Sequence, residues 1–343
     1  MVSAFLSSLR HGGLFSLAFT TLSLFSTQIR AEQQSLPFLE ITGIPGTGKS
    51  SLLRLLWKIL GRKGRNEGIH PKSANDKARY RSFRQVSNLP VFLLESDQEF
   101  GKRSSYKDHD WEELKTLYNG GALQDRAVKN NGNEVDSQKF TGTMLICQNT
   151  PVNGSNAVLE RLIPLYFDKK NITKENSKAA LELEKYKTKA VCGWVHLVLT
   201  HESQFLKNYY THYEEILETL EKSPCYKNPR VAHNLAQLIS AVLCLKAFLP
   251  EIEVEKVLSF GAQLQESFEK RAGGGNPFIS SFLDAFHLHN LAGDEDDGIT
   301  KRYATKQHLN HSVDPGLIAI NIRHFNEVMR EKKSDTFNEI ELR

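Results

Sequence analysis

The sequence predicts an α/β fold in which a parallel central sheet carries a phosphate-binding loop, followed by a helical domain and a small mixed C-terminal domain. Two observations support it. The pattern G-x-x-x-x-G-K-S lies at Gly43–Ser50, between an apolar strand candidate and a helix candidate. Further short apolar runs read as buried strands, whereas helical spacing dominates after residue 171. We expect four parts within the 343 residues: an N-terminal helical segment (1–36), a phosphate-loop core (37–170), a helical domain (171–275) and a C-terminal domain (276–343).

The N-terminal segment contains an apolar stretch, Leu14 to Phe25, that resembles the core of a secretion signal. It lacks a small residue at Ile29, where cleavage would require one, and it is too short to span a bilayer. Its apolar residues instead fall near one helical face. We therefore expect a helix packed beside the core of a cytoplasmic protein with no membrane contact, and export is the alternative.

The phosphate-binding loop has the flanking elements that its chemistry requires. Phe38–Thr42 predicts a buried strand, and residues 51–60 predict the helix whose N-terminus faces the phosphates. Lys49 would reach the β- and γ-phosphates of ATP, and Ser50 would bind Mg²⁺. The residues that we expect to contact the nucleotide are Gly43, Ile44, Pro45, Gly46, Thr47, Gly48, Lys49, Ser50 and Ser51.

Acidic residues follow a second apolar run. The apolar run at residues 89–94 is followed by Glu95-Ser96-Asp97. This pattern is typical of a Walker B strand, which brings carboxylates to Mg²⁺ and the attacking water. Alternation along a strand places Glu95 and Asp97 on one face. We assign Glu95 as general base or metal-water ligand and Asp97 as its partner, and the two roles can be exchanged.

The next segment predicts a helix and then a hairpin. Asp110 with Glu113 forms a capping box, and Gly120 is a natural helix stop. Residues 122–135 read as a hairpin with its tip at 130–133. A third apolar run, Thr143–Cys147, then ends in Gln148-Asn149, and Arg161 precedes a fourth run at 162–167.

This order of motifs resembles the superfamily 3 helicases, the AAA+ motors of phage, plasmid and viral replication. The sequence most resembles the ATPase part of bacterial primase-helicases of phages and integrative elements. Sequence segments similar to residues 37–43 and 114–120 recur in those proteins. It covers residues 28 to 170 strongly. Those proteins usually have adjacent Walker B acids, whereas Ser96 separates them here, and they generally carry zinc-ribbon and primase modules upstream. We expect no primase chemistry from this sequence.

The resemblance implies roles for further residues. Asn149 would be the sensor of the γ-phosphate, and Arg161 would be an arginine finger that acts on a neighbouring subunit of a hexamer. The hairpin would enter the central channel, where Arg126 and Lys129, with Lys139 as a further cation, would contact DNA phosphates. Single-stranded or forked DNA and a separately encoded primase are the implied partners.

Composition permits this function without selecting it. The net charge is only +4, and the four cysteines form no C-x-x-C pair, which argues against a zinc ribbon or a disulfide framework. Residues 171–275 show helical spacing without a catalytic constellation, and a helix should start at Asn228-Pro229. Two rivals to a DNA motor stay open: a nucleotide-binding switch or replication partner without turnover, and a P-loop nucleotide kinase.

Overall fold

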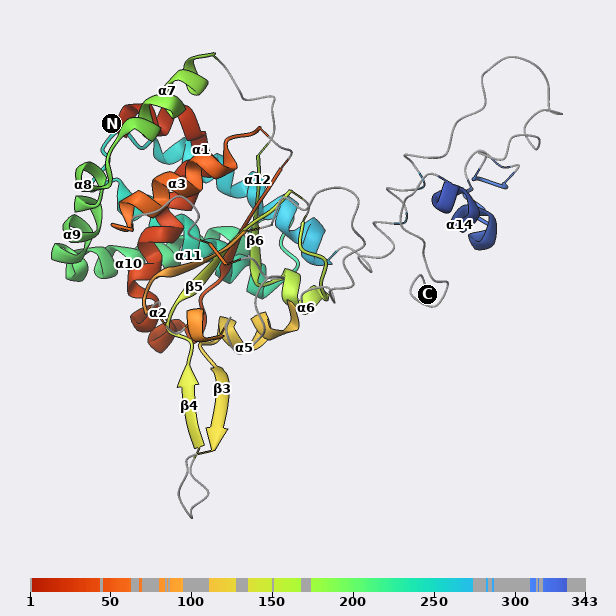
Figure 1. Cartoon of the computed structure of the whole chain (residues 1–343), viewed down its shortest axis with the longest axis horizontal. Coiled ribbons are helices and arrows are strands. Elements are labelled where there is room, and N and C mark those ends of the chain that lie inside the picture. The colour runs from red at the N-terminus through yellow and green to blue at the C-terminus, as the bar shows by residue number, and fades with distance from the viewer. Residues whose placement is uncertain are drawn as a thin grey trace. The chain divides into compact units, whose positions relative to one another are not determined.

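A computed structural model describes most of the chain in two compact units, residues 1–273 and 274–343. Figure 1 shows the described elements of both units. The described residues are 2–43, 46–62, 68–69, 80–83, 85, 87–94, 111–127, 135–149, 151–167, 174–273, 282, 286, 309–312, 314 and 317–331.

The first unit contains a four-stranded parallel sheet with the order β2-β5-β1-β6. Its strands are β1 (Phe38–Thr42), β2 (Pro90–Leu94), β5 (Thr143–Cys147) and β6 (Leu162–Tyr166). All four apolar runs are therefore strands, as predicted. In register, Leu39 of β1 faces Leu145 of β5 and Ile163 of β6. Because the strands are parallel, their carboxyl ends share one edge of the sheet.

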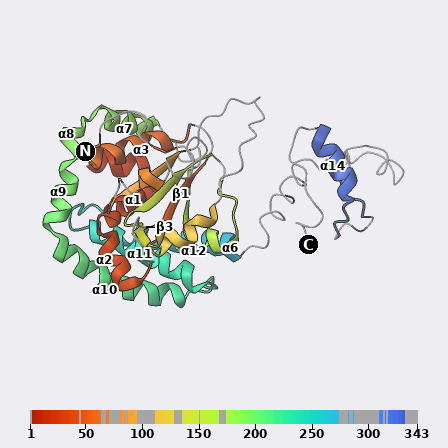
Figure 2. The ribbon, with the colours of Figure 1, turned by 60° about the horizontal axis from the view of Figure 1, so that its bottom comes forward.

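Alternate residues of the strands face two separate cores. Leu39 and Ile41 belong to the larger core, which contains residues of α1 (Val2–Leu22), α3 (Lys49–Ile59) and α11 (Pro229–Leu245). Phe38 belongs to the smaller core, with α5 (Leu114–Tyr118) and α6 (Asn156–Leu159). Figure 2 shows helices on either side of the strands. A sheet covered on both faces explains why its strands are nearly continuous apolar runs.

The N-terminal segment is helical, as predicted. The helix α1 is followed by η1 (Ser23–Phe25) and α2 (Ser26–Gln33). The predicted apolar face is buried in the larger core, through Leu14, Leu17, Ala18, Leu22, Phe25 and Ile29. Within the described part of the chain, no helix is long and apolar enough to cross a membrane.

A two-stranded hairpin stands apart from the main sheet. Its strands β3 (Ala122–Ala127) and β4 (Val135–Lys139) are antiparallel, and they extend away from the helices and the main sheet in Figure 1. Arg30 of α2 holds the base of the hairpin, because its guanidinium donates to the carbonyls of Tyr118 at 3.1 Å and Gly142 at 2.7 Å. Burial lowers the pKa of Arg30 to about 10. The base of the hairpin is thus fixed to the N-terminal segment.

The remainder of the first unit is helical. Asn228 caps α11 by accepting a hydrogen bond from the Arg230 amide at 2.9 Å, with Pro229 in the first turn, which confirms the predicted start. The other helices are α7 (Lys174–Lys185), α8 (Thr188–Val191), α9 (Gly193–Thr200), α10 (Glu202–Glu221) and α12 (Val254–Gly273).

The second unit has a small apolar core of its own beside α14 (Ile322–Glu331). Its buried residues are Phe282, Phe286, Leu309, Phe325, Val328 and Met329.

Candidate nucleotide-binding site

The predicted phosphate-binding loop connects β1 to α3 at the carboxyl edge of the sheet. Gly43 has a φ of 142°, and a Cβ atom there would lie 2.0 Å from the carbonyl oxygen of Phe167, so only glycine fits. Gly48 has a φ of 90°, and the place where its Cβ would stand is open for 4 Å. The backbone before α3 is therefore accessible to a ligand, as a loop that binds phosphate requires.

Lys49 lies at the start of α3 and is 7% exposed. Its ammonium group donates to the carbonyl oxygen of Gly43 and, at 3.2 Å, to Oδ1 of Asn149. The structure thus brings together the loop lysine and the predicted sensor. A buried ammonium group at the start of a helix is well placed to meet an anion.

The other loop residues differ in exposure. Thr47 is buried, Ser50 is exposed and Ser51 is half-buried at the first turn of α3. Ser50 is therefore accessible to a metal ion. Ile44 and Pro45 lie outside the described residues.

The predicted Walker B acids, Glu95 and Asp97, also lie outside the described residues. The strand that leads to them is described: β2 ends at Leu94, which pairs in register with Cys147 of β5. The chain therefore leaves β2 at the edge where Lys49 and Asn149 meet.

Arg161 lies at the opposite edge of the sheet. Its carbonyl oxygen accepts a hydrogen bond from the amide of Phe38 at 2.9 Å, at the amino end of β1. A strand of five residues is about 16 Å long, so the structure does not bring Arg161 to the Lys49 site of its own chain.

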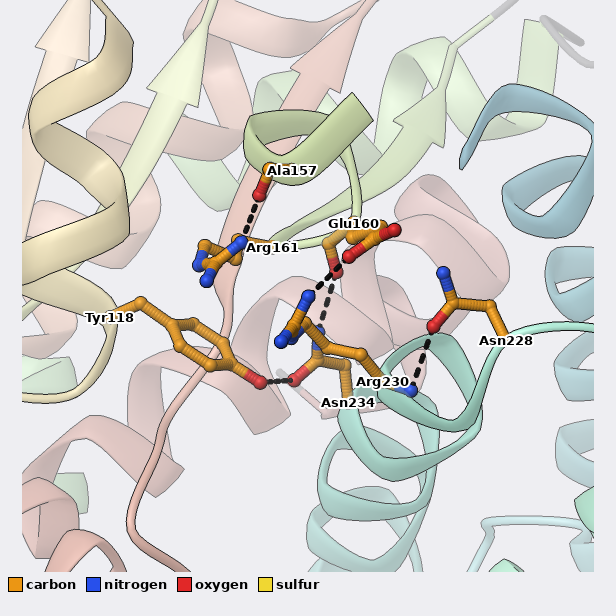
Figure 3. Close-up of polar contacts among 7 residues, drawn as sticks. All are labelled: Tyr118, Ala157, Glu160, Arg161, Asn228, Arg230 and Asn234. Carbon is orange, nitrogen blue, oxygen red and sulfur yellow. Dashed lines mark hydrogen bonds and ion pairs between the residues drawn. The ribbon is translucent and has the colours of Figure 1, made fainter. Parts of the chain in front are cut away.

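The guanidinium of Arg161 has a defined environment, shown in Figure 3. Its Nη1 donates to the carbonyl oxygen of Ala157, and its Cζ lies 5.1 Å from the ring centroid of Tyr118. Burial lowers the pKa of Arg161, and the nearby charge of Arg230 lowers it further. The alternative to the finger role is an ion pair within the chain, to Glu160 or Asp168. In the described residues Glu160 pairs with Arg230 and not with Arg161, and Asp168 lies outside the described residues.

Sequence reasoning missed Arg230, Asn234 and Tyr118. Arg230 is in the first turn of α11 and its side chain is 41% exposed. Asn234 accepts from the Tyr118 hydroxyl at 2.6 Å and donates to the Glu160 carbonyl at 2.8 Å (Figure 3). The predicted start of α11 placed Arg230 in a first turn, but no sequence signal links α11 to the residues before β6.

The predicted DNA-binding residues are only partly described. Arg126 is on β3 opposite Asp136 of β4, while its side chain and the whole of Lys129 lie outside the described parts. Lys139, at the end of β4, is exposed. The predicted hairpin is present, but its second strand starts at Val135, where the prediction ended, and ends at Lys139.

Comparison with known proteins bears on the fold of the chain. No family model matches the chain, and no curated protein does. A solved structure described as "SCCmec type IV Cch - active helicase" superposes with a TM-score of 0.56 at 11% identity, over 99% of this chain and 65% of that one. The chain has a helicase-type fold. It spans 65% of that helicase's length.

A second solved structure, JCV helicase bound to a small molecule, superposes with a TM-score of only 0.30 at 11% identity, over 74% of this chain and 65% of that one. A superposition that poor does not bear on the fold.

Proposed function

We propose that this chain is an AAA+ ATPase of superfamily 3 helicase type, which hydrolyses ATP to translocate on or unwind DNA in phage or mobile-element replication. The observation that carries the proposal is the contact between Lys49 and Asn149 at the carboxyl edge of the sheet, beside a glycine loop that opens a helix. The helicase-type fold supports it.

The residues at this edge fit ATP and Mg²⁺. The open side of Gly48 leaves room for phosphate, the N-terminus of α3 favours negative charge, and Lys49 supplies a cation. Ser50, Glu95 and Asp97 are the residues that would hold Mg²⁺, which when bound neutralises phosphate charge. The residues that would hold the triphosphate are Gly43, Ile44, Pro45, Gly46, Thr47, Gly48, Lys49, Ser50 and Ser51.

In the proposed reaction each protein group has a separate task. Lys49 stabilises the charge that develops on the transferred phosphoryl group. Glu95 accepts the proton of the attacking water with Asp97 as its partner, or the two exchange roles. Asn149 orients that water or senses the γ-phosphate.

Arg161 requires a second subunit for its proposed role. It lies at the amino edge of the sheet, one strand length, about 16 Å, from the carboxyl edge that carries Lys49, so we propose that it serves the ATP of a neighbour. We propose a hexameric ring in which Arg161, with Arg230 beside it, faces the neighbour's γ-phosphate. The carboxylates near these two arginines are Glu160, which pairs with Arg230, and Glu112, whose charge acts on Arg161.

The proposed DNA contact is the hairpin β3–β4. Arg126 and Lys129 would bind backbone phosphates without reading sequence, and Arg30 would keep the base of the hairpin fixed. A cytoplasmic location and a separately encoded primase complete the proposal.

Steady-state ATP turnover with and without single-stranded DNA tests the proposed function. A DNA motor predicts turnover that DNA stimulates and that Lys49→Ala strongly lowers. A nucleotide kinase would instead need a small-molecule phosphate acceptor, and a switch would bind ATP without turnover. Either of these two results would replace the motor.

A further inference from the structure

A fully buried carboxylate lies in the middle of the central strand. Glu40 of β1 is 0% exposed, and it pairs in register with Ile146 of β5 and Pro164 of β6. Burying a carboxylate is strongly unfavourable unless the charge is paired and hydrogen-bonded. An apolar residue at this position would make the sheet more stable. The carboxylate must therefore have a role other than stabilising the sheet.

The partners of Glu40 come from two elements distant in sequence. Its Oε2 forms an ion pair with Nη1 of Arg271 in the last turn of α12, whose side chain is 17% exposed. Its Oε1 accepts from the amide of Val152 and, at 3.3 Å, from Nε2 of Gln148. Nη2 of Arg271 also donates to the carbonyl of Val152 at 3.3 Å. The pair therefore holds both polar groups of residue 152.

These contacts enclose the predicted sensor. Gln148 and Val152 lie on either side of Asn149, whose Oδ1 accepts from Lys49 at 3.2 Å. The chain after β5 is thus fixed to Glu40 before and after the residue that meets the phosphate-loop lysine. A side chain that must orient one water molecule requires this kind of support.

We infer that the Glu40–Arg271 ion pair positions Asn149 for catalysis and connects the sensor to the end of α12. This inference rests on the proposed ATPase activity. Glu40 and Arg271 touch no substrate, so they are positioning residues that act through Asn149. Loss of the pair should lower turnover and leave nucleotide binding intact.

The test is a double-mutant cycle between Arg271→Lys and Asn149→Ala, with kcat and ATP affinity measured for each protein. Arg271→Lys keeps the charge but replaces the planar fork, which donates to Glu40 through Nη1 and to Val152 through Nη2, with a single ammonium group. We expect it to lower kcat by about tenfold to a hundredfold without weakening ATP binding. Because Arg271 acts through Asn149, the combined variant should turn over no more slowly than Asn149→Ala alone.

Two further variants complete the experiment. Lys270→Ala is the matched control, since Lys270 adjoins Arg271 but pairs with Glu266 in solvent at 2.7 Å, and it should behave as the wild type. Glu40→Gln combined with Arg271→Gln removes both buried charges at once, and this variant is used if Arg271→Lys does not fold. It should show the same loss of kcat.

The outcomes separate the two claims. If the wild type is active and the losses in kcat multiply in the combined variant, or kcat and affinity fall together, the positioning role is wrong and the ATPase stands. A folded charge-free variant with normal kcat also overturns it. A wild type that does not turn over ATP overturns the proposed function, and the inference with it.

Discussion

The Nζ atom of Lys49 lies 3.2 Å from Oδ1 of Asn149, although 100 positions separate them in the chain. They meet because β1 and β5 are parallel neighbours whose carboxyl ends share one edge. We expect a bound triphosphate to replace Asn149 as the hydrogen-bond partner of the Lys49 ammonium group. The Asn149 amide would then face the γ-phosphate.

Lys49 and Glu95 should fail in different ways when substituted. Lys49→Ala removes the buried cation, so it should weaken ATP binding and lower kcat by about 10²-fold to 10³-fold. Glu95→Gln should retain ATP and lower kcat by about 10²-fold or more, because only the proton acceptor is lost. Equilibrium binding of a fluorescent ATP analogue and steady-state turnover measure the two effects. Normal ATPase rates in folded Glu95→Gln and Asp97→Asn would show that the Walker B assignment is wrong.

Asn149→Ala should lower turnover by about tenfold to a hundredfold while ATP affinity changes little. An amide that orients water acts on the transition state rather than on the bound nucleotide. The ratio of kcat loss to affinity loss is the measurement. Equal loss of both would indicate an asparagine that only supports the fold of the loop.

The hairpin charges should determine how salt affects DNA binding. Neutralising Arg126 and Lys129 together should lower the slope of log K against log salt by about 1.4 to 1.8, because each phosphate contact contributes about 0.7 to 0.9. Basal ATPase should not change. The control variant neutralises Lys222, which follows the last residue of α10, and Lys256 of α12. Both are exposed, so the control removes the same charge elsewhere on the protein. An unchanged slope in the hairpin variant would show that these charges are solvated and do not contact DNA.

His233 should make the fold sensitive to mild acid. Burial lowers the pKa of His233 below its ordinary value of 6.5, with a smaller effect from the charge of Arg230. As pH falls, the unfolded chain therefore takes up the proton first, so stability from this group is full above about pH 6.5 and is lost below it. His233→Gln should reduce the drop in unfolding temperature between pH 7.5 and 5.5. His196→Gln, exposed on α9, is the control, and equal drops in all three proteins would contradict the prediction.

Mixed subunits should reveal whether Arg161 acts on a neighbour. Arg161→Ala and Glu95→Gln proteins should each be inactive, whereas their mixture should recover part of the ATPase activity at interfaces with an intact arginine and an intact carboxylate. The control mixes Arg161→Ala with a variant that carries both changes, which forms no intact interface. No recovery in proven mixed rings would remove the role in trans, and a monomer with full DNA-stimulated turnover would remove the ring as well.

The sequence predicted most elements of the core but few of its polar contacts. Strand periodicity, glycines and caps are local signals, and they located β1, the hairpin and the start of α11. Strand order is not local, so the sequence could not place β5 beside β1, where Asn149 meets Lys49. The pair Glu40–Arg271 depends on how α12 packs against the sheet. The pair Glu160–Arg230 depends on how α11 packs against the turn before β6. The roles of all the predicted site residues stay predictions, those of Lys49, Asn149 and Arg161 included, and Glu95, Asp97 and Lys129 lie outside the described residues.

Strand separation of a forked DNA duplex tests the central claim most directly. The account predicts separation by the wild type with ATP and Mg²⁺, and none with a non-hydrolysable ATP analogue or with Lys49→Ala. The contradicting result is a wild-type preparation that binds forked DNA and hydrolyses ATP at a rate that DNA does not change, and that leaves the duplex intact.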